Sequence, residues 1–315
     1  MNWPESVAVL CGGVGGSRFL CGLAQVVQNK RITAVVNTGD DIVLHGLHIS
    51  PDVDIVLYSL AGLIDEARGW GIKGDTFRCL ETMKELGMET WFTLGDRDLA
   101  THIFRTSLLS QGRTLSEATH ELADRLNVRV KVIPMTDQRF ETRVKTPSGW
   151  MNFQEYLVKR QMRDDILRLG FPGREKAPPA PGVLKSVSRS DLLILPPSNP
   201  FVSTGTILSL PGVRKAVEKR KGPTVAISPI IGGKVVKGPL AKMMHAYGRE
   251  VSSLSVAHMY RGLLDGFVLD AHDSRFMDQL KLTGMEVLVT DTMISGLGSS
   301  KRLAGEVLEF SKALT

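Results

Sequence analysis

The chain carries a glycine-rich loop near its start that could bind an anion such as phosphate. Gly12, Gly13, Gly15 and Gly16 follow a short apolar run and precede a helical pattern that Ser17 could cap. Glycines let the backbone approach a ligand closely, and a helix N-terminus offers free N–H groups to an anion. The spacing fits neither the G-x-G-x-x-G dinucleotide motif nor the P-loop. The loop therefore indicates either a phosphate site or an ordinary tight turn.

Four carboxylates within fifteen positions form a second group that could hold a metal ion. Asp40 and Asp41 follow an apolar run, and Asp52 and Asp54 lie close behind them. Hard oxygen ligands of this kind suit Mg²⁺ that bridges a diphosphate. The alternative is that Asp52, or the neighbouring Ser50, only caps a helix.

Three further positions carry side chains that could be charged: an arginine, a histidine and a lysine. Arg97 could bind a phosphate through both arms of its guanidinium, or lie in a surface turn with Asp98 as a helix cap. His102 follows one turn later and is expected to pack rather than to act as a base. Gly238 opens a further helical pattern, where Lys242 could add charge to an anion site; an ordinary helix start is an equal alternative.

The elements that must position these residues are short apolar strands that alternate with amphipathic helices. Helices are predicted from about residues 17, 52 and 77, and another over 114–126, where Thr114 and Glu117 form a capping box. The predicted strands cover residues 7–11, 32–36, 128–133, 192–195, 224–227, 267–269 and 287–289. This alternation predicts a Rossmann-like, doubly wound α/β fold with a mostly parallel sheet that is covered on both faces.

Polar residues follow the carboxyl ends of several predicted strands. They include Asn37, Ser198 and Asn199, Ser228, Asp270, and Asp291 with Thr292. Ligands of open parallel sheets bind beyond these ends. The sequence therefore predicts one ligand cleft, at this edge of the sheet.

Residues 135–181 interrupt the alternation, with several prolines and with the aromatic residues Trp150, Phe153 and Tyr156. We interpret them as an inserted smaller subdomain. It could be a lid over a ligand, or a small separate core. Residues 1–134 and 182–315 are then expected to form the Rossmann-like, nucleotide-binding domain.

Composition narrows the classes of function. The net charge of +6 suits anionic ligands, but no run of lysine and arginine exceeds three residues, so a nucleic-acid partner is not expected. The three cysteines lack the spacing of a zinc or redox site. The sequence has neither a signal-peptide layout nor an apolar stretch long enough for a membrane span, so a cytoplasmic location without a membrane partner is expected.

Longer runs that contain these residues occur in a fixed order along nearly the whole chain. They are residues 12–16, 36–41, 49–54, 70–72, 75–77, 94–102, 134–137, 197–200, 228–232 and 251–253. Together they resemble the 2-phospho-L-lactate transferase family. The glycine loop alone would not be specific.

The resemblance implies a reaction. A 2-phospholactate or phosphoenolpyruvate-type group would pass from a guanosine diphosphate ester, lactyl-2-diphospho-5'-guanosine or its enolpyruvyl analogue, to the deazaflavin 7,8-didemethyl-8-hydroxy-5-deazariboflavin. The terminal ribityl hydroxyl would attack and GMP would leave, as a step of coenzyme F(420) biosynthesis. The resemblance further implies Mg²⁺ as cofactor and a homodimer.

Site residues follow from the same resemblance. Asp52, Asp54 and Arg97 would be catalytic, and Asp41 and Asp54 would hold the metal. The residues expected to bind substrate are Gly12, Gly13, Gly15, Gly16, Asn37, Asp40, Ser198, Asn199 and Ser228. Which aspartate is the base, and which three-carbon acid the donor carries, stay open.

A second class of function shares the fold. Some related proteins are non-catalytic regulators of metabolism that bind nucleotide sugars. The runs at residues 50–54 and 70–71 fit the transferases better.

Overall fold

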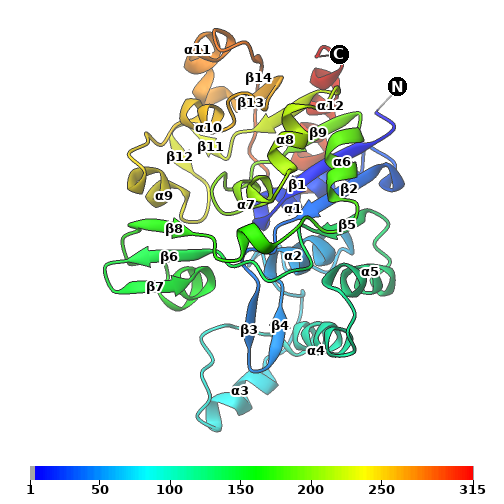
Figure 1. Ribbon diagram of the computed structural model, residues 1–315, viewed down its shortest axis with the longest axis vertical. Coiled ribbons are helices and arrows are strands. Elements are labelled where there is room, and N and C mark those ends of the chain that lie inside the picture. Colours follow the sequence, from blue (N-terminus) through cyan, green and yellow to red (C-terminus); the bar gives the residue numbers. More distant parts are fainter. Residues whose placement is uncertain (1–3, 315) are drawn as a thin grey trace.

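The computed structural model describes residues 4–314, and a seven-stranded parallel sheet forms its centre (Figure 1). The strands lie in the order β14-β13-β10-β9-β1-β2-β5. In chain order they are β1 (Val7–Cys11), β2 (Ile32–Val36), β5 (Lys131–Pro134), β9 (Leu192–Leu195), β10 (Thr224–Ile227), β13 (Gly266–Asp270) and β14 (Glu286–Thr290). The chain builds one half outward from β1 and the other outward from β9, so the predicted doubly wound fold is confirmed.

Side chains of the central strand alternate between two hydrophobic cores. Ala8 and Leu10 of β1 belong to one core, whereas Val7, Val9 and Cys11 belong to the other. Successive side chains of a strand point to opposite faces, so each core covers one face of the sheet. Burial on both faces explains why the strands are continuous apolar runs rather than alternating ones.

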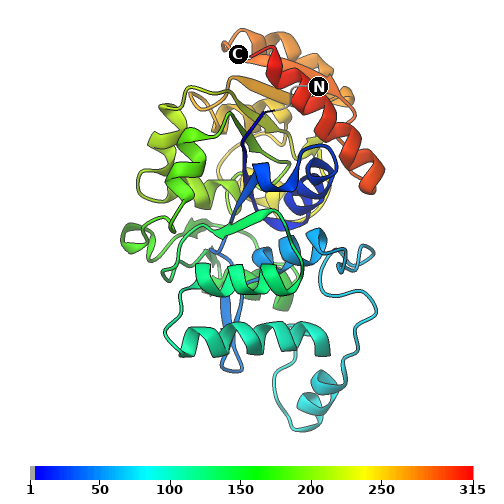
Figure 2. The ribbon, with the colours of Figure 1, turned by 90° about the vertical axis from the view of Figure 1, so that its right-hand side faces the viewer.

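Helices cover both faces of the sheet. The α-helices of the described residues are α1 (Gly13–Ala24), α2 (Pro51–Leu60), α3 (Arg78–Glu85), α4 (Asp96–Ser110), α5 (Leu115–Arg125), α6 (Val183–Arg189), α7 (Thr204–Ser209), α8 (Val213–Glu218), α9 (Leu240–Ala246), α10 (Ser253–Met259), α11 (Met277–Lys281) and α12 (Leu297–Lys312). On one face α1 packs between α2 and the C-terminal α12 (Figure 2). Apolar residues of α6, α8 and α10 belong to the other core. Within residues 4–314, no helix has the length and apolar character to cross a membrane.

The predicted starts of one helix and one strand were wrong, whereas a predicted helix cap is confirmed. Helix α1 begins at Gly13 with Gly12 as its N-cap. Ser17 therefore lies inside the helix, where its hydroxyl donates to the Val14 carbonyl at 3.0 Å. Strand β5 begins at Lys131, later than the predicted residue 128. The capping box of Thr114 and Glu117 is present at the start of α5.

Smaller elements surround the main sheet. The hairpin of β3 (Ile42–Leu44) and β4 (Leu47–Ile49) extends below it beside α4, and α3 lies lower still without a single buried residue (Figure 1). A second hairpin joins β11 (Ile230–Ile231) to β12 (Lys234–Val235).

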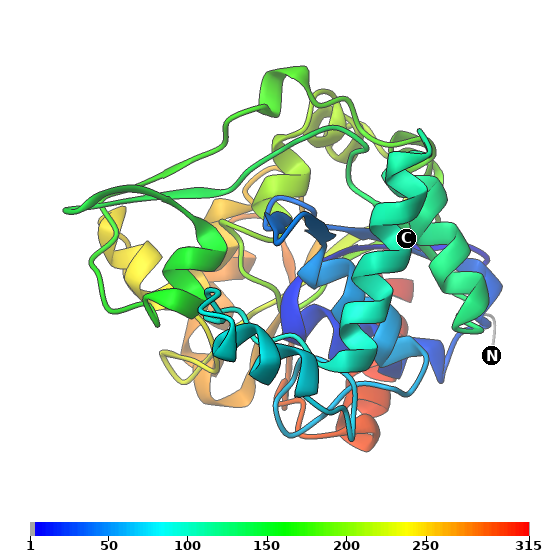
Figure 3. The same cartoon turned by 90° about the horizontal axis from the view of Figure 1, so that it is seen from below.

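The segment 135–181 contains its own antiparallel sheet. Its strands are β6 (Arg143–Thr146), β7 (Gly149–Asn152) and β8 (Arg168–Gly170), and a π-helical turn spans Glu155–Lys159. Seen from below, this sheet lies beside α9 and opposite α4 and α5 (Figure 3). This segment therefore adds a three-stranded sheet beside the main one.

Candidate active site

A cavity of about 590 Å³ lies at the carboxyl ends of the central strands. Strands β1 and β9 are neighbours there, and the chain leaves them in opposite directions. Such a switch point is where open α/β sheets bind ligands, and the volume is within the range of small-molecule sites. The walls come from α2, α4, the segment 135–181 and the loops after β1, β9, β10 and β14. The cavity lies where the sequence predicted a cleft.

The glycine loop forms the part of the cavity at the N-terminus of α1. Gly12, Gly13 and Gly15 line it, whereas Gly16 does not. Gly13 has a φ of +67°, which favours glycine. A Cβ at Gly15 would collide with the carbonyl oxygen of Pro197. The glycines thus permit close packing of two loops and leave the first turn of α1 facing the cavity.

Asp52 joins the starts of α1 and α2. Its Oδ1 accepts a hydrogen bond from the Gly13 amide at 2.9 Å, and its Oδ2 accepts one from Asn37 Nδ2 at 2.8 Å. Asn37 is held in turn by Thr206, whose hydroxyl donates to Asn37 Oδ1 at 2.7 Å. Burial raises the pKa of Asp52 to about 6, and the charge of Asp41 adds to the rise, although its two hydrogen bonds oppose it. Asp52 therefore caps α1 and also gives the cavity a carboxylate that titrates near neutrality.

Asp40 and Asp41 have carboxylate oxygens that no group of the described chain satisfies. Oδ1 of each is buried and has no hydrogen-bond partner among residues 4–314. Burial, followed by the charge of Asp52, raises the pKa of Asp40 well above its usual range. Asp41 Oδ2 accepts from the Ser50 hydroxyl and lies 3.0 Å from His48 Nε2. Among the described residues, Asp40 lines the cavity and Asp41 does not, so Asp40 is the one of the two that a ligand in the cavity could contact.

The free oxygen of Asp40, which follows Asn37 and precedes Asp41 in the chain, fits a magnesium ion that also binds substrate in the cavity. Magnesium is usually held by one or two carboxylates, with water and substrate phosphates as its other ligands. Within residues 4–314, no three acidic, histidine or cysteine side chains gather into a ready-made metal site. Asp40 could therefore hold the ion only together with a phosphate ligand.

Asp54 has a partner that the sequence did not suggest. Arg105 of α4 is fully buried, and its guanidinium donates to both oxygens of Asp54, at 3.1 Å from Nη1 to Oδ2 and by a closer contact from Nη2 to Oδ1. Burial raises the pKa of Asp54, and Arg105 opposes the rise. A metal at Asp54 would have to compete with this bidentate ion pair. Only the position of Arg105 one helical turn after His102 could have indicated that it faces inward.

Arg97 lies outside the cavity. Its side chain is exposed, and its amide donates to Asp75 Oδ1 at 2.9 Å. Among the described residues, Arg18 and Lys237 are the arginine and lysine side chains that line the cavity. Arg18 donates to the Glu66 carbonyl at 3.2 Å, and Lys237 donates to the Arg68 carbonyl at 3.1 Å.

Ser198, Asn199 and Ser228 line the cavity and also hold its loops in place. The Ser198 hydroxyl donates to the Gly12 carbonyl at 2.8 Å. Asn199 Oδ1 accepts from the Phe201 amide at 2.9 Å. The Ser228 hydroxyl donates to the Ile230 carbonyl at 3.0 Å. The Ser198 contact fixes the loop after β9 against the glycine loop, and the Ser228 contact holds the loop after β10 within itself.

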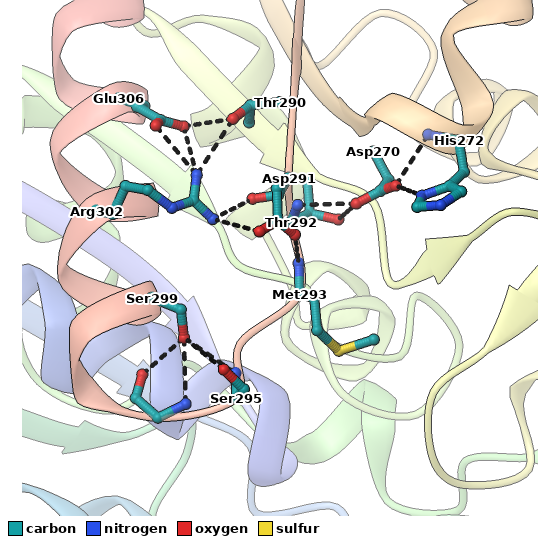
Figure 4. A network of polar contacts seen from close by, with 11 residues as sticks. Asp270, His272, Thr290, Asp291, Thr292, Met293, Ser295, Ser299, Arg302 and Glu306 are labelled. Carbon is teal, nitrogen blue, oxygen red and sulfur yellow. Dashed lines mark hydrogen bonds and ion pairs between the residues drawn. The ribbon is translucent and has the colours of Figure 1, made fainter.

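Polar contacts at the ends of β13 and β14 position a further wall of the cavity (Figure 4). Asp270 Oδ2 accepts from the amide of Thr292 at 2.9 Å and from its hydroxyl at 3.1 Å. Arg302 pairs with Asp291 at 3.1 Å and with Glu306 at 3.0 Å. Asp270 and Asp291 thus hold the chain so that Thr292, and not the two carboxylates, lines the cavity.

The segment 135–181 forms a small core together with Val202 and Met243 from outside it, and it also faces the cavity. Phe153 and Tyr156 are buried in that core, whereas Trp150 is 43% exposed. Phe153 also lines the cavity, as do the neighbouring residues Gln154, Leu157, Val158 and Met162. Lys242 does not serve an anion site, because its ammonium donates to the carbonyls of residues 162, 163 and 164 at 2.7, 3.2 and 3.4 Å.

A doubly wound parallel sheet, with a glycine-lined cavity at its switch point, is typical of α/β proteins that bind nucleotide-like ligands. Residues 7–302 match the family described as 2-phospho-L-lactate transferase CofD. The chain therefore belongs to the 2-phospho-L-lactate transferase family, as the resemblance indicated, and is a transferase. This membership is consistent with a step of coenzyme F(420) biosynthesis and gives the regulatory alternative no support.

Individual relatives agree with this assignment. The chain is 41% identical to a phosphoenolpyruvate transferase of Streptomyces coelicolor over 97% of its length and 98% of the relative. It is 41% identical to a 2-phospho-L-lactate transferase of Methanococcoides burtonii over 95% and 97% of the two chains. A crystal structure of a UPF0052-family protein from Bacillus halodurans shares the fold, with a TM-score of 0.64, 17% identity, and coverage of 98% of this chain and 99% of that one.

Proposed function

We propose that this chain transfers a phosphorylated three-carbon acid from a guanosine diphosphate ester to 7,8-didemethyl-8-hydroxy-5-deazariboflavin and releases GMP. The observation that carries the proposal is one cavity lined both by the glycine loop at the start of α1 and by Asp40, a carboxylate with an unsatisfied oxygen. Relatives of nearly equal identity are named for phosphoenolpyruvate and for 2-phospho-L-lactate, so the proposal covers both acids. The homodimer and the cytoplasmic location are proposals that rest on the resemblance and the sequence.

The glycine loop would hold the diphosphate of the donor. The first turn of α1 offers N–H groups and the positive end of the helix dipole. Arg18 and Lys237 line the same cavity and would neutralise charge on the departing GMP. Because little covalent chemistry is required of the protein in phosphoryl transfer, positioning and charge neutralisation would supply most of the rate.

Asp40, with Asp41 next to it in the chain, would hold Mg²⁺ between the protein and the diphosphate. The ion would supply charge neutralisation at the phosphate oxygens. We assign it to these two residues rather than to Asp54, because both oxygens of Asp54 already accept from Arg105. Asp54 would instead keep Arg105 in place beneath the cavity.

Asp52 would accept the proton of the attacking hydroxyl. The ribityl oxygen forms a bond to the phosphorus that carries the acid, the bond from that phosphorus to the bridging oxygen breaks, and GMP leaves with that oxygen. The hydroxyl proton must move to a base, and a pKa of about 6 lets Asp52 be ionised at neutral pH and still basic enough to accept it. Both oxygens of Asp52 retain lone pairs beyond the two hydrogen bonds that they accept.

Mass spectrometry of the product tests the proposal. The purified protein is incubated with the deazaflavin, Mg²⁺ and either the lactyl or the enolpyruvyl donor, with an EDTA-treated sample as control. We expect a deazaflavin phosphodiester with one donor or both, and none after chelation. The absence of any phosphodiester with either donor would overturn the proposal, and an undiminished yield in EDTA would overturn its metal component.

A further inference from the structure

His102 has a buried donor that no group of the described chain satisfies. Its side chain is 2% exposed and lines the cavity from α4. Nε2 lies 3.4 Å from Asp98 Oδ1 without forming a hydrogen bond, and it has no other partner within residues 4–314. An unpaired polar atom in a buried position is unfavourable, and most such atoms in native proteins have a partner. A ligand in the cavity could supply the missing one.

The opposite side of the ring fixes which nitrogen carries the proton. Nδ1 lies 3.3 Å from Arg105 Nη1, and the guanidinium can only donate. As the acceptor of this contact, Nδ1 leaves the ring N–H on Nε2; the nearest carboxylate oxygen to Nδ1, Asp54 Oδ2 at 3.6 Å, already accepts from Arg105. Arg105 is itself held by Asp54, so Nδ1 keeps this partner and Nε2 remains the donor of a residue that lines the cavity.

A carboxylate stands beside this donor. Asp98 lies one helical turn before His102, lines the same cavity, and is held by the Tyr58 hydroxyl, which donates to Oδ1 at 2.7 Å. The pair therefore presents an N–H donor and a carboxylate acceptor side by side. Ile55 and Phe92 also line the cavity and give it apolar surface suited to a flat ring.

We propose that His102 and Asp98 bind the edge of a heterocycle that carries a carbonyl oxygen next to a ring N–H. His102 donates to the carbonyl, and Asp98 accepts from the N–H. Within the proposed function, on which the identity of the ligand rests, both the pyrimidinedione ring of the deazaflavin and the guanine of the donor have such an edge. His102 is thus a ligand-binding residue and not the catalytic base.

Two substitutions of His102 distinguish the loss of the Nε2 donor from the loss of the contact between Nδ1 and Arg105. In His102→Asn the shorter amide reaches the position of Nδ1 and keeps a partner for Arg105, but it removes the donor at Nε2. In His102→Gln the amide reaches the position of Nε2 and restores a donor there. Dissociation constants are measured for each variant with two probes, the deazaflavin and GDP, together with the melting temperature.

We expect His102→Asn to weaken binding of one probe by roughly tenfold, the scale of one lost hydrogen bond, and to leave the other within about twofold. His102→Gln should recover most of the loss, and the affected probe identifies the heterocycle. If His102→Asn changes neither constant, or weakens both equally while lowering the melting temperature, His102 is a packing residue and the inference is wrong.

The binding experiment tests the proposed site separately from the proposed reaction. If the wild-type chain forms no phosphodiester but its affinity for one probe depends on His102, the proposed reaction fails and the binding site stands. If the chain forms product and both variants bind both probes as the wild type does, the reaction stands and the binding site fails.

Discussion

The carboxylates around the cavity differ in what each one already contacts. Asp52 caps α1, and Asp54 is paired with a buried arginine. Asp40 and Asp41 each keep a free oxygen among the described residues. Residues of one type and one sequence cluster thus divide into a proposed base, a structural ion pair and candidate metal ligands. The sequence predicted the cluster, but it could not predict this division, because Arg105 lies 51 positions after Asp54 and is brought to it only by the packing of α4.

The pKa of Asp52 predicts the pH dependence of turnover. Its pKa is raised to about 6, so the carboxylate is protonated and inactive as a base below that pH, and ionised above it. We expect the rate to rise about tenfold per pH unit below pH 6 and to level off above it. Asp52→Asn should lower the plateau by roughly 10²- to 10⁴-fold and abolish the dependence. If the Asp52→Asn variant kept the wild-type profile, Asp52 would be excluded as the base.

The buried carboxylate of Asp40 should destabilise the folded protein at neutral pH. Its pKa is raised in the folded protein, so the folded state is favoured at acidic pH and this advantage is lost as the pH rises through the folded pKa. In metal-free buffer at about pH 7.5, Asp40→Asn should therefore raise the melting temperature, by about 2–4 °C per kcal/mol of relieved charge burial. The gain should vanish near about pH 4, close to the ordinary pKa of an aspartate, while turnover with Mg²⁺ falls. A variant that melts lower than the wild type at neutral pH would contradict this reading.

Arg18 and Arg97 form a matched pair of substitutions. Arg18 lines the cavity, whereas the side chain of Arg97 is exposed outside it. Arg18→Ala should lower kcat/KM roughly 10²-fold, the scale of one lost electrostatic contact to the transition state. Arg97→Ala should stay within about threefold of the wild type. The reverse order would restore Arg97 to the catalytic role that the family resemblance implied.

At the scale of elements, the cavity is built by loops that other loops hold in place. The strands and most helices were predictable, because a parallel sheet buried on both faces leaves continuous apolar runs separated by helical periodicity. The start of α1 was predicted too late, because Gly13 and Gly15 disfavour a helix by propensity alone. Asp52 compensates by capping the first turn from another helix. Such a contact between distant segments leaves no local signal.

The segment 135–181 is likewise contacted by a distant residue that the local sequence could not reveal. Lys242 of α9 binds three of its carbonyls. Lys242→Met should therefore loosen the cavity wall at Met162 and speed limited proteolysis near residues 160–165 several-fold. Lys185→Met, at an exposed position of α6, is the control. Equal cleavage of the two variants would show that other contacts hold the segment.

At the scale of the whole molecule, the charge of the chain and the charge of its cavity have opposite signs. The chain carries a net charge of +6, yet Asp40, Asp52, Asp54 and Asp98 all line the cavity. Arg105 neutralises one of these carboxylates from behind. Arg18, Lys237 and a bound cation would have to offset the rest before a diphosphate could enter. A metal ion and the donor would therefore bind together in one site.

The most direct test of this account is the stoichiometry of GMP release. Purified protein, Mg²⁺ and the active donor are mixed with and without the deazaflavin, and GMP and deazaflavin phosphodiester are quantified together. The account predicts one GMP for each phosphodiester, almost none without the deazaflavin, and almost none with Asp52→Asn. GMP released at the same rate without the deazaflavin, or no GMP under any of these conditions, would contradict transfer at this cavity.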